Sequence, residues 1–377
     1  MRNKLVYLDN AATSHPKPAT VINAVGKAIA GIAGSPGRGG HKGSLAAARM
    51  MFSARETIAE FFGLSCPERI VFTRNATEGL NIAIKGLIHA GHKVAISRLE
   101  HNSVIRPIMA RKNVGVDVDY APCDNNGLPD IVNLPDVDYL VTTSASNVTG
   151  AVINTQALAS ACRKKNIKLI LDAAQSAGSI PLNAKDVDVL VCSGHKGLLG
   201  PQGIGFVYFA PGMEPDCFLE GGTGSDSESE RMPDIWPDKF EAGTPNVPGV
   251  AGLKAGIEYI KRMPVAKIRQ KELATLKLLI SNLKDMEGVT VYGPGKLSSR
   301  AGLVSFNVAG IDPSIIADEL DSQGVAVRAG LHCAPEAHKF IGSFPQGSVR
   351  VSPGPFTALK DINIFIEAMR RILKKKR

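Results

Sequence analysis

Two short apolar runs, each leading into a residue that can do chemistry, are the most informative feature of the sequence. Ile167–Leu171 leads into Asp172, and Val187–Cys192 leads into the tetrapeptide Ser193–Lys196. The ends of neighbouring buried strands meet where α/β sheets bind ligands. A lysine and an acid placed there suit pyridoxal phosphate (PLP), because the lysine forms a Schiff base and the acid keeps the ring nitrogen protonated. The same two residues could instead form a surface salt bridge, which stabilises little.

A candidate phosphate site lies at Ala76, Thr77 and Glu78, where a strand is expected to turn into a helix. Backbone N–H groups at a helix start bind phosphate, and Thr77 adds a hydroxyl at the expected cap. Thr77 followed by Glu78 is equally an ordinary helix cap, so both interpretations stay open. The sequence contains no Gly-Lys-Ser/Thr phosphate loop, which argues against an ATPase.

Three further polar residues fall at the same edge of the predicted sheet. His101 could lie flat on an aromatic cofactor and move protons, or be an ordinary loop histidine. Asn147 follows a predicted strand, and Gln175 stands three residues after Asp172. Either amide could hydrogen-bond a ring hydroxyl of the cofactor. Each residue alone indicates little, but together they favour one cofactor site at this edge.

A cysteine in a loop punctuated by Gly and Pro is the candidate nucleophile. Cys333 follows His332 directly and stands five residues after Arg328, and such electropositive surroundings favour the thiolate. Cys333 could also be an inert packing residue. Arg350 could clamp a substrate carboxylate as a bidentate fork, or it could pair with a structural acid.

The segments that must position these residues alternate between strands and helices from about Thr20 to Gly212. The expected strands are Ile70–Phe72, Lys93–Ile96, Val116–Tyr120, Tyr139–Thr142, Lys168–Leu171, Val187–Cys192 and Gly205–Phe209. The helical patterns between them include Leu45–Phe62, Thr77–His89 and Thr155–Lys165. This alternation predicts an α/β fold with a mostly parallel sheet and helices on both faces.

From about Val250 the pattern becomes α+β. A long amphipathic stretch, Gly252–Glu287, is expected to break near Pro264. The segments after it are the strands Val289–Tyr292 and Leu303–Asn307 and the helices Pro313–Gln323 and Leu359–Lys375. We therefore predict a large domain of residues 16–250 and a smaller α+β domain of residues 1–15 and 251–377.

The chain of 377 residues has an ordinary globular composition, with 44% hydrophobic and 21% charged residues. No apolar run reaches the roughly 18 residues of a membrane helix, and no signal-peptide pattern opens the sequence, so a cytoplasmic location is expected. The six cysteines are far apart and predict neither a zinc site nor a disulfide framework. The net charge of +9 is dispersed except at Lys374–Arg377, which does not predict a nucleic-acid partner.

In their order along the chain, these motifs resemble the class-V aminotransferase superfamily of fold-type I PLP enzymes, and within it the cysteine desulfurases. The resemblance covers nearly the whole chain and rests on Tyr7–Thr13, Ala76–Glu78, Glu100–Asn102, Asn147, Asp172–Gln175, Ser193–Gly197, Gly243–Pro245 and Arg328–Cys333. It implies a large domain with a mostly parallel seven-stranded sheet flanked by helices, and a smaller α+β domain at the carboxyl end.

The resemblance also implies roles for individual residues. Lys196 resembles the PLP lysine, Asp172 the pyridinium partner and His101 the stacking residue. The residues that resemble the remaining cofactor ligands are Ala76, Thr77, Ser193 and His195 at the phosphate and Asn147 and Gln175 at the ring. Thr244 resembles a residue that reaches the phosphate of the neighbouring subunit, which implies a homodimer with shared active sites.

Cys333 resembles the sulfur-accepting cysteine of the group II desulfurases, and Arg350 resembles their carboxylate clamp, with Arg328 and Asn147 as further substrate contacts. The implied reaction converts L-cysteine to L-alanine: Lys196 removes the Cα proton, and Cys333 takes the sulfur as a persulfide for an acceptor protein. Two departures are Leu331, where many group II members have histidine, and Pro335–Lys339. The alternatives are a selenocysteine lyase, another lyase or transaminase of this fold, and a non-catalytic sulfur-binding protein.

Overall fold

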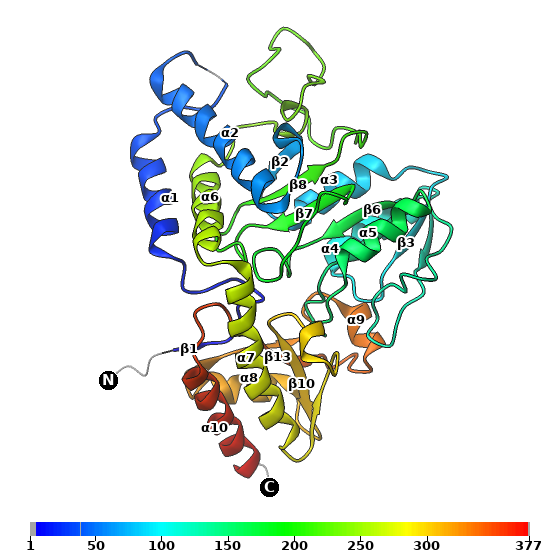
Figure 1. The fold of residues 1–377 in the computed structure, drawn as a ribbon, viewed down its shortest axis with the longest axis vertical. Helices are drawn as coiled ribbons and strands as arrows, with labels where there is room; N and C mark the ends of the chain where they lie inside the picture. The colour runs from blue at the N-terminus through cyan, green and yellow to red at the C-terminus, as the bar shows by residue number, and fades with distance from the viewer. Residues whose placement is uncertain (1–4, 38, 376–377) are drawn as a thin grey trace.

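The computed structural model describes residues 5–37 and 39–375, and a seven-stranded sheet of order β2-β8-β7-β6-β5-β3-β4 forms its centre (Figure 1). The strands are β2 (Ile70–Thr73), β3 (Lys93–Ile96), β4 (Asp117–Tyr120), β5 (Tyr139–Thr143), β6 (Lys168–Asp172), β7 (Val189–Ser193) and β8 (Gly205–Phe209). β8 pairs antiparallel with both of its neighbours, whereas the pairs from β7 to β4 are all parallel. The predicted mostly parallel sheet and its seven strands are confirmed.

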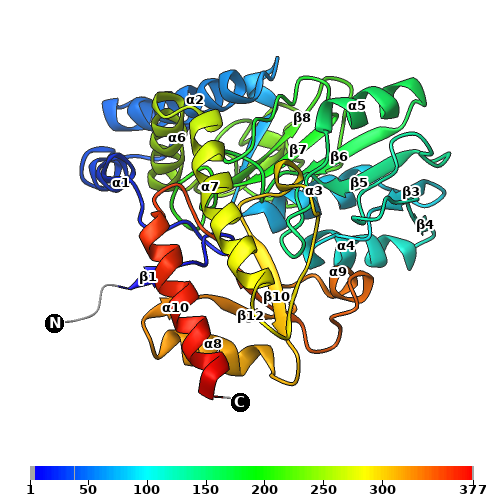
Figure 2. The same ribbon diagram turned by 60° about the horizontal axis from the view of Figure 1, so that its bottom comes forward.

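Helices cover both faces of this sheet because alternate residues of each strand point to opposite sides. In β7, Leu190 and Cys192 join one apolar core, while Val189 and Val191 join the other. The first core includes α2 (Lys42–Phe62), α5 (Thr155–Lys164) and α6 (Val247–Arg262), and the second includes α3 (Ala76–Leu87) and α4 (Asn102–Lys112). Figure 2 shows these two helical layers on either side of the sheet, with α1 (Ala19–Gly31) packed outside α6.

A second, antiparallel sheet of order β12-β13-β10-β9 lies towards the carboxyl end of the chain. Its strands are β9 (Val289–Val291), β10 (Val304–Val308), β12 (Arg328–Gly330) and β13 (Ser348–Val351). The helices α7 (Val265–Lys284), α8 (Pro313–Asp321) and α10 (Leu359–Lys375) enclose a third apolar core with it. The short helix α9 (Pro335–Phe340) follows β12. The predicted helix break is confirmed, since α6 ends at Arg262 and α7 begins after Pro264.

The amino-terminal segment returns to this second part of the molecule. β1 (Val6–Tyr7) pairs in parallel with β11 (Val325–Ala326). The division into domains at residue 250, which would fall inside α6, stays a prediction. Residues 1–4 and 376–377 lie outside the described residues. Both ranges belong to the predicted small domain, and residues 376–377 also belong to the basic tail. No helix in the described part of the chain has the length and apolarity needed to cross a membrane.

Two glycines let the start of α3 lie directly on the ends of β7 and β8. A Cβ atom on Gly205 would lie 2.8 Å from the Cys192 carbonyl oxygen and 2.9 Å from the Asn75 carbonyl carbon. A Cβ atom on Gly79 would lie 2.9 Å from a methyl group of Val191. Only a residue without a side chain permits this approach. The positive end of the α3 dipole is thereby placed above the sheet edge.

Candidate active site

The carboxyl ends of four strands and the start of α3 surround one cavity. Nine of the ten residues predicted to contact the cofactor line it: Ala76, Thr77, His101, Asn147, Asp172, Gln175, Ser193, His195 and Lys196. Asp172 ends β6 and Ser193 ends β7, its parallel neighbour. The parallel register therefore brings together residues that are far apart in the sequence.

Lys196 and Asp172 are two ionisable residues that line this cavity. Burial lowers the pKa of the Lys196 amine to about 8, and the negative charge of Asp172 opposes that shift. Burial raises the pKa of the Asp172 carboxyl group. The Ala174 N–H donates to its Oδ1 at 2.9 Å, and this hydrogen bond and the positive charge of Lys196 both lower that pKa. An amine with a pKa near 8 is partly neutral at ordinary pH, so it can act as a nucleophile and as a base.

His101 caps the amino end of α4 with its own ring. Its Nδ1 accepts a hydrogen bond from the backbone N–H of Ser103 at 3.0 Å. Because that nitrogen is an acceptor, we assign the proton of the neutral ring to Nε2. Burial lowers the pKa of His101 to about 4, and the nearby positive charges of Lys196 and Arg328 add to this effect. His101 is therefore a neutral ring that carries its proton on Nε2.

The start of α3 differs from the prediction in one respect. Asn75, and not Thr77, is the capping residue: its side chain accepts from the Glu78 N–H at 3.0 Å, and the helix begins at Ala76. The prediction of Thr77 as the cap is therefore wrong, because the helix begins two residues earlier than a Thr77 cap would require and Thr77 lies inside its first turn. The backbone N–H groups of Ala76 and Thr77, at the start of the helix, have no partner inside it. They remain available for an anion, and the Thr77 hydroxyl, which contacts Ser103, stands beside them.

The residues of the cavity fit PLP. An amine, a buried carboxyl group and the donors of a helix start all line this one cavity. The Nδ1 atom of His195 is buried and has no hydrogen-bond partner among the described residues. A buried polar atom without a partner is costly, which favours a ligand that supplies the missing contact.

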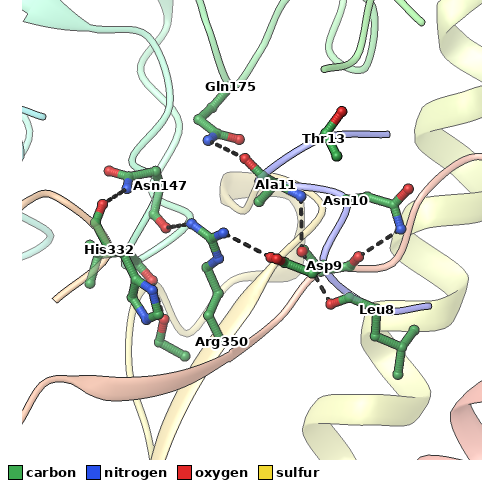
Figure 3. Close-up of polar contacts among 12 residues, drawn as sticks. Leu8, Asp9, Asn10, Ala11, Thr13, Asn147, Gln175, His332 and Arg350 are labelled. Atoms are coloured by element: carbon green, nitrogen blue, oxygen red, sulfur yellow. Dashed lines mark hydrogen bonds and ion pairs between the residues drawn. The ribbon is translucent and has the colours of Figure 1, made fainter. Parts of the chain in front are cut away.

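Arg350 is fixed by two contacts next to this cavity (Figure 3). Its Nη2 lies 3.0 Å from Oδ1 of Asp9, and its Nη1 donates to the Asn147 carbonyl oxygen at 3.1 Å. The side chain is 2% exposed, and its Nε has no partner among the described residues. Of the two roles left open for Arg350, the structure shows the pairing with an acid, and the Nε donor has no partner among the described residues.

Two amide side chains join the same network (Figure 3). The Asn147 amide donates to the His332 carbonyl oxygen at 2.7 Å, and the Gln175 amide donates to the Ala11 carbonyl oxygen at 3.0 Å. The Asn147 hydrogen bond joins the loop after β5 to the Cys333 loop. The Gln175 hydrogen bond joins the turn after β6 to the amino-terminal segment. Both amides also line the cavity.

Cys333 lies at the rim of the cavity on a tightly bent loop. Its side chain is exposed, and it shares an adjoining hollow with Thr77 and His101. His332 and Cys333 both have positive φ angles, 48° and 58°. Non-glycine residues rarely adopt this conformation, and it is typical of functional loops. The Asn102 N–H donates to the Cys333 carbonyl oxygen at 2.8 Å, which ties the loop to the start of α4.

His332 does not supply positive charge to Cys333, contrary to the prediction. The ring is buried, its Nε2 lies 3.1 Å from the Ser348 carbonyl oxygen, and burial lowers its pKa to about 2. Lys85 and Arg106 line the hollow that contains Cys333 and bring positive charge to it. Arg328 and Arg350 lower the pKa of Lys196, and a Cys333 thiolate would raise it, so these groups act on one another.

Two predicted residues lie away from the Lys196 cavity. Thr244 lines a separate hollow with Arg74 and Phe218. Arg328 is exposed on β12, directly opposite Arg350 on β13. The structure of a single chain therefore does not bring Thr244 to the cofactor cavity.

Three residues of the site were missed. Asp9 holds Arg350, and Ser103 contacts both Thr77 and His101. Glu100 is fully buried, accepts a hydrogen bond from the Thr143 N–H at 2.8 Å and another from the Ser97 hydroxyl, and has a pKa raised to about 8 by burial. Asp9 and Glu100 lie in two of the motifs that carry the family resemblance, without a predicted role of their own, and the sequence signal for Ser103 is that it stands two residues after His101.

This chain is similar to known proteins over nearly its full length. The aminotransferase class-V family model matches residues 6–365. A protein of Pyrococcus abyssi named "Probable cysteine desulfurase" is 32% identical over 99% of this chain and 96% of its own. A protein of the same name from Methanothermobacter thermautotrophicus is 33% identical over 97% and 94%. The solved cysteine desulfurase of Thermococcus onnurineus NA1 has a TM-score of 0.92 and 32% identity, and it covers 98% of this chain and 95% of that chain.

Proposed function

Because the chain belongs to the class-V aminotransferase family, we propose that it is a PLP-dependent cysteine desulfurase, which converts L-cysteine to L-alanine and takes the sulfur on Cys333. The observation that carries this proposal is that one cavity is lined by Lys196 and Asp172, while Cys333 shares the adjoining hollow with His101. The desulfurase names of the relatives support it over a selenocysteine lyase.

When bound, PLP supplies a carbonyl carbon that takes up the substrate amine and a ring that accepts electrons. Lys196 would hold the carbonyl carbon, and Asp172 would lie at the ring nitrogen. The N–H groups of Ala76 and Thr77, together with the side chains of Thr77, Ser193 and His195, would hold the phosphate. The neutral ring of His101 would stack on the cofactor, with Gln175 and Asn147 at its edge.

Lys196 is the base that we propose for the Cα proton. Its lowered pKa gives it a neutral fraction at pH 7 to 8, which a lysine in water does not have. Efficient proton transfer needs a pKa near the working pH. The Asp172 charge keeps the Lys196 pKa from falling further, so the amine can also hold the proton after it has taken it.

Arg350 and Arg328 are the cations that we propose for the substrate carboxylate. Asp9 and Asn147 already orient the Arg350 side chain, and its Nε has no hydrogen-bond partner among the described residues. A guanidinium held in one orientation loses little rotamer freedom when it binds a carboxylate. Arg328 lies opposite it on the neighbouring strand and is exposed, so it can reach the same group.

Cys333 is the sulfur acceptor in this proposal. Its thiolate attacks the substrate sulfur, so that a sulfur–sulfur bond forms while the carbon–sulfur bond breaks and its electron pair stays with the carbon fragment. The product on the enzyme is a Cys333 persulfide. Lys85 and Arg106 line the hollow beside Cys333, which suits an acidic acceptor protein that collects the sulfur.

The assembly is proposed to be a homodimer. Thr244 is separate from the Lys196 cavity of its own chain, as a residue that completes the neighbouring active site would be. Mixed dimers of Lys196→Ala and Thr244→Ala chains would then recover activity that neither variant has alone. The cytoplasmic location stays a prediction.

The experiment that tests the function is an assay of alanine and sulfide together. We expect equal amounts of both from L-cysteine, PLP and dithiothreitol. The Cys333→Ala variant should keep the absorbance of the bound cofactor and lose sulfide release, whereas Lys196→Ala should lose both. Full desulfuration by Cys333→Ala would contradict the persulfide step. Turnover of L-selenocysteine without turnover of L-cysteine would favour the lyase instead.

A further inference from the structure

The hydroxyl group of Ser103 lies between a residue of the phosphate site and the His101 ring. Its Oγ is 2.7 Å from Oγ1 of Thr77 and 2.9 Å from Nδ1 of His101. Ser103 is 7% exposed, so water has little access to replace either contact. Thr77 stands in the first turn of α3 and Ser103 in the first turn of α4, and the two helices pack against each other.

The proton of this hydroxyl can serve only one of the two neighbours. The Ser103 backbone N–H already donates to Nδ1 of His101, so Nδ1 has no proton to give back. The Ser103 hydroxyl therefore donates either to Nδ1 or to the Thr77 oxygen. A serine hydroxyl has one proton and two lone pairs, so it cannot donate to both.

We propose that Ser103 is a positioning residue that couples the cofactor phosphate to the His101 ring through Thr77. This inference rests on the proposed PLP site. With phosphate bound at the start of α3, the Thr77 hydroxyl would donate a hydrogen bond to a phosphate oxygen. The Thr77 oxygen would then accept a hydrogen bond from the Ser103 hydroxyl. Without phosphate, Thr77 donates to Ser103, and Ser103 donates to Nδ1 of His101.

Binding of phosphate thus withdraws the Ser103 proton from His101. Nδ1 keeps the backbone N–H as its donor, so the ring keeps its proton on Nε2 in both states. The number of hydrogen bonds that Nδ1 accepts differs between the two states. This difference alters the basicity of the ring and how strongly its orientation is fixed. Thr77, His101 and Ser103 line both the cofactor cavity and the hollow of Cys333. The coupling therefore links the phosphate site to the hollow that contains Cys333.

The first test compares PLP with pyridoxal, which has no phosphate. Each is titrated into the cofactor-free full-length chain and followed by the absorbance of the lysine-bound cofactor. We expect Ser103→Ala to weaken PLP binding about three- to tenfold, the effect of one hydrogen bond, and to leave pyridoxal binding unchanged. The backbone donor to His101 survives in this variant, so the start of α4 is kept. Ser281→Ala, which removes a hydroxyl from the exposed face of α7, is the matched control and should change neither affinity.

A double-mutant cycle separates coupling from a general structural role. If Ser103 acts through Thr77, Ser103→Ala should change PLP affinity less than twofold in a Thr77→Ala chain. Independent, additive losses would overturn the inference. Equal losses of PLP and pyridoxal affinity would also overturn it, because a packing defect does not distinguish the two ligands.

The second test observes His101 directly. In ¹⁵N-histidine-labelled protein, the Nδ1 resonance of His101 should shift differently on addition of PLP and of pyridoxal, although both rings stack on it, and Ser103→Ala should abolish the difference. A shift that persists in Ser103→Ala would contradict the coupling. Failure of PLP to react with Lys196 would instead refute the proposed function, so the two failures are distinct.

Discussion

The guanidinium of Arg350 lies 3.0 Å from the carboxylate of Asp9, although 341 residues separate them in the sequence. Both residues are held by further contacts of the amino-terminal segment: β1 pairs with β11, and the Asn10 amide donates to the Ser352 carbonyl oxygen at 3.0 Å. The first described residues of the chain are thus part of the substrate side of the site. An arginine that is buried and oriented in this way can bind a carboxylate without first being ordered.

Removal of Asp9 should destabilise the protein strongly. Asp9→Ala leaves the Arg350 charge buried with 2% exposure and without its acid, and breaking a buried pair costs about 3 kcal/mol or more. The free energy of unfolding in urea measures this effect. Glu319→Ala, which removes the partner of the exposed Lys375, is the control and should cost less than about 0.5 kcal/mol. Equal effects of the two variants would contradict a structural role for Asp9.

Arg350→Lys should impair substrate binding more than turnover. Lysine keeps the positive charge but cannot hold Asp9, the Asn147 carbonyl group and a substrate carboxylate at once. We expect KM for L-cysteine to rise about tenfold or more, the effect of one charged hydrogen bond, with a smaller change in kcat. An unchanged KM with a reduced kcat would exclude the clamp. The matched control is Arg163→Lys, at an exposed pair far from the cavity.

Lys196→Met should stabilise the cofactor-free protein in a pH-dependent way. The pKa of Lys196 is about 8 in the folded protein and about 10.4 in an unfolded chain. Between these values the unfolded chain binds more protons, so the stability of the natural chain rises with pH. We expect the variant to be more stable by about 3 kcal/mol below pH 8 and to lose this advantage above pH 10.4. Urea unfolding at several pH values measures it, and a constant difference would contradict the lowered pKa.

Gly205→Ala should weaken cofactor binding by moving the start of α3. The new methyl group would lie within 2.9 Å of the Asn75 backbone, so the helix start must shift. We expect a loss of about 2 kcal/mol of stability and a weaker affinity for PLP. Gly26→Ala is the control, because Gly26 lies in α1 with no atom within 4 Å of the added Cβ. That variant should gain about 0.5 to 1 kcal/mol and bind PLP normally.

The amino-acid sequence by itself determined the central sheet and the residues at its edge. The apolar runs of β6 and β7 are local patterns, and the turns that follow them carry Asp172 and Lys196 wherever the strands end. Parallel strands joined by helices present those ends at one edge, so the convergence follows from pattern and connection rules alone. The helix break at Pro264 is local for the same reason, because it depends on one residue's backbone.

Only the tertiary structure decided the contacts that join distant segments. β12 has only three residues and β13 has polar residues at two of its four positions, so neither is recognised from the sequence alone. Their pairing places Arg328 opposite Arg350. The choice of Asn75 over Thr77 as a cap lay between two side-chain acceptors only two residues apart, which local pattern does not resolve. Ser103 meets Thr77 because α3 and α4 pack on one face of the sheet, and Asp9 meets Arg350 because β1 adds to a distant strand. Such pairings depend on the packing of whole elements, since the free energy that selects them comes from burial across the fold and not from neighbours in the chain.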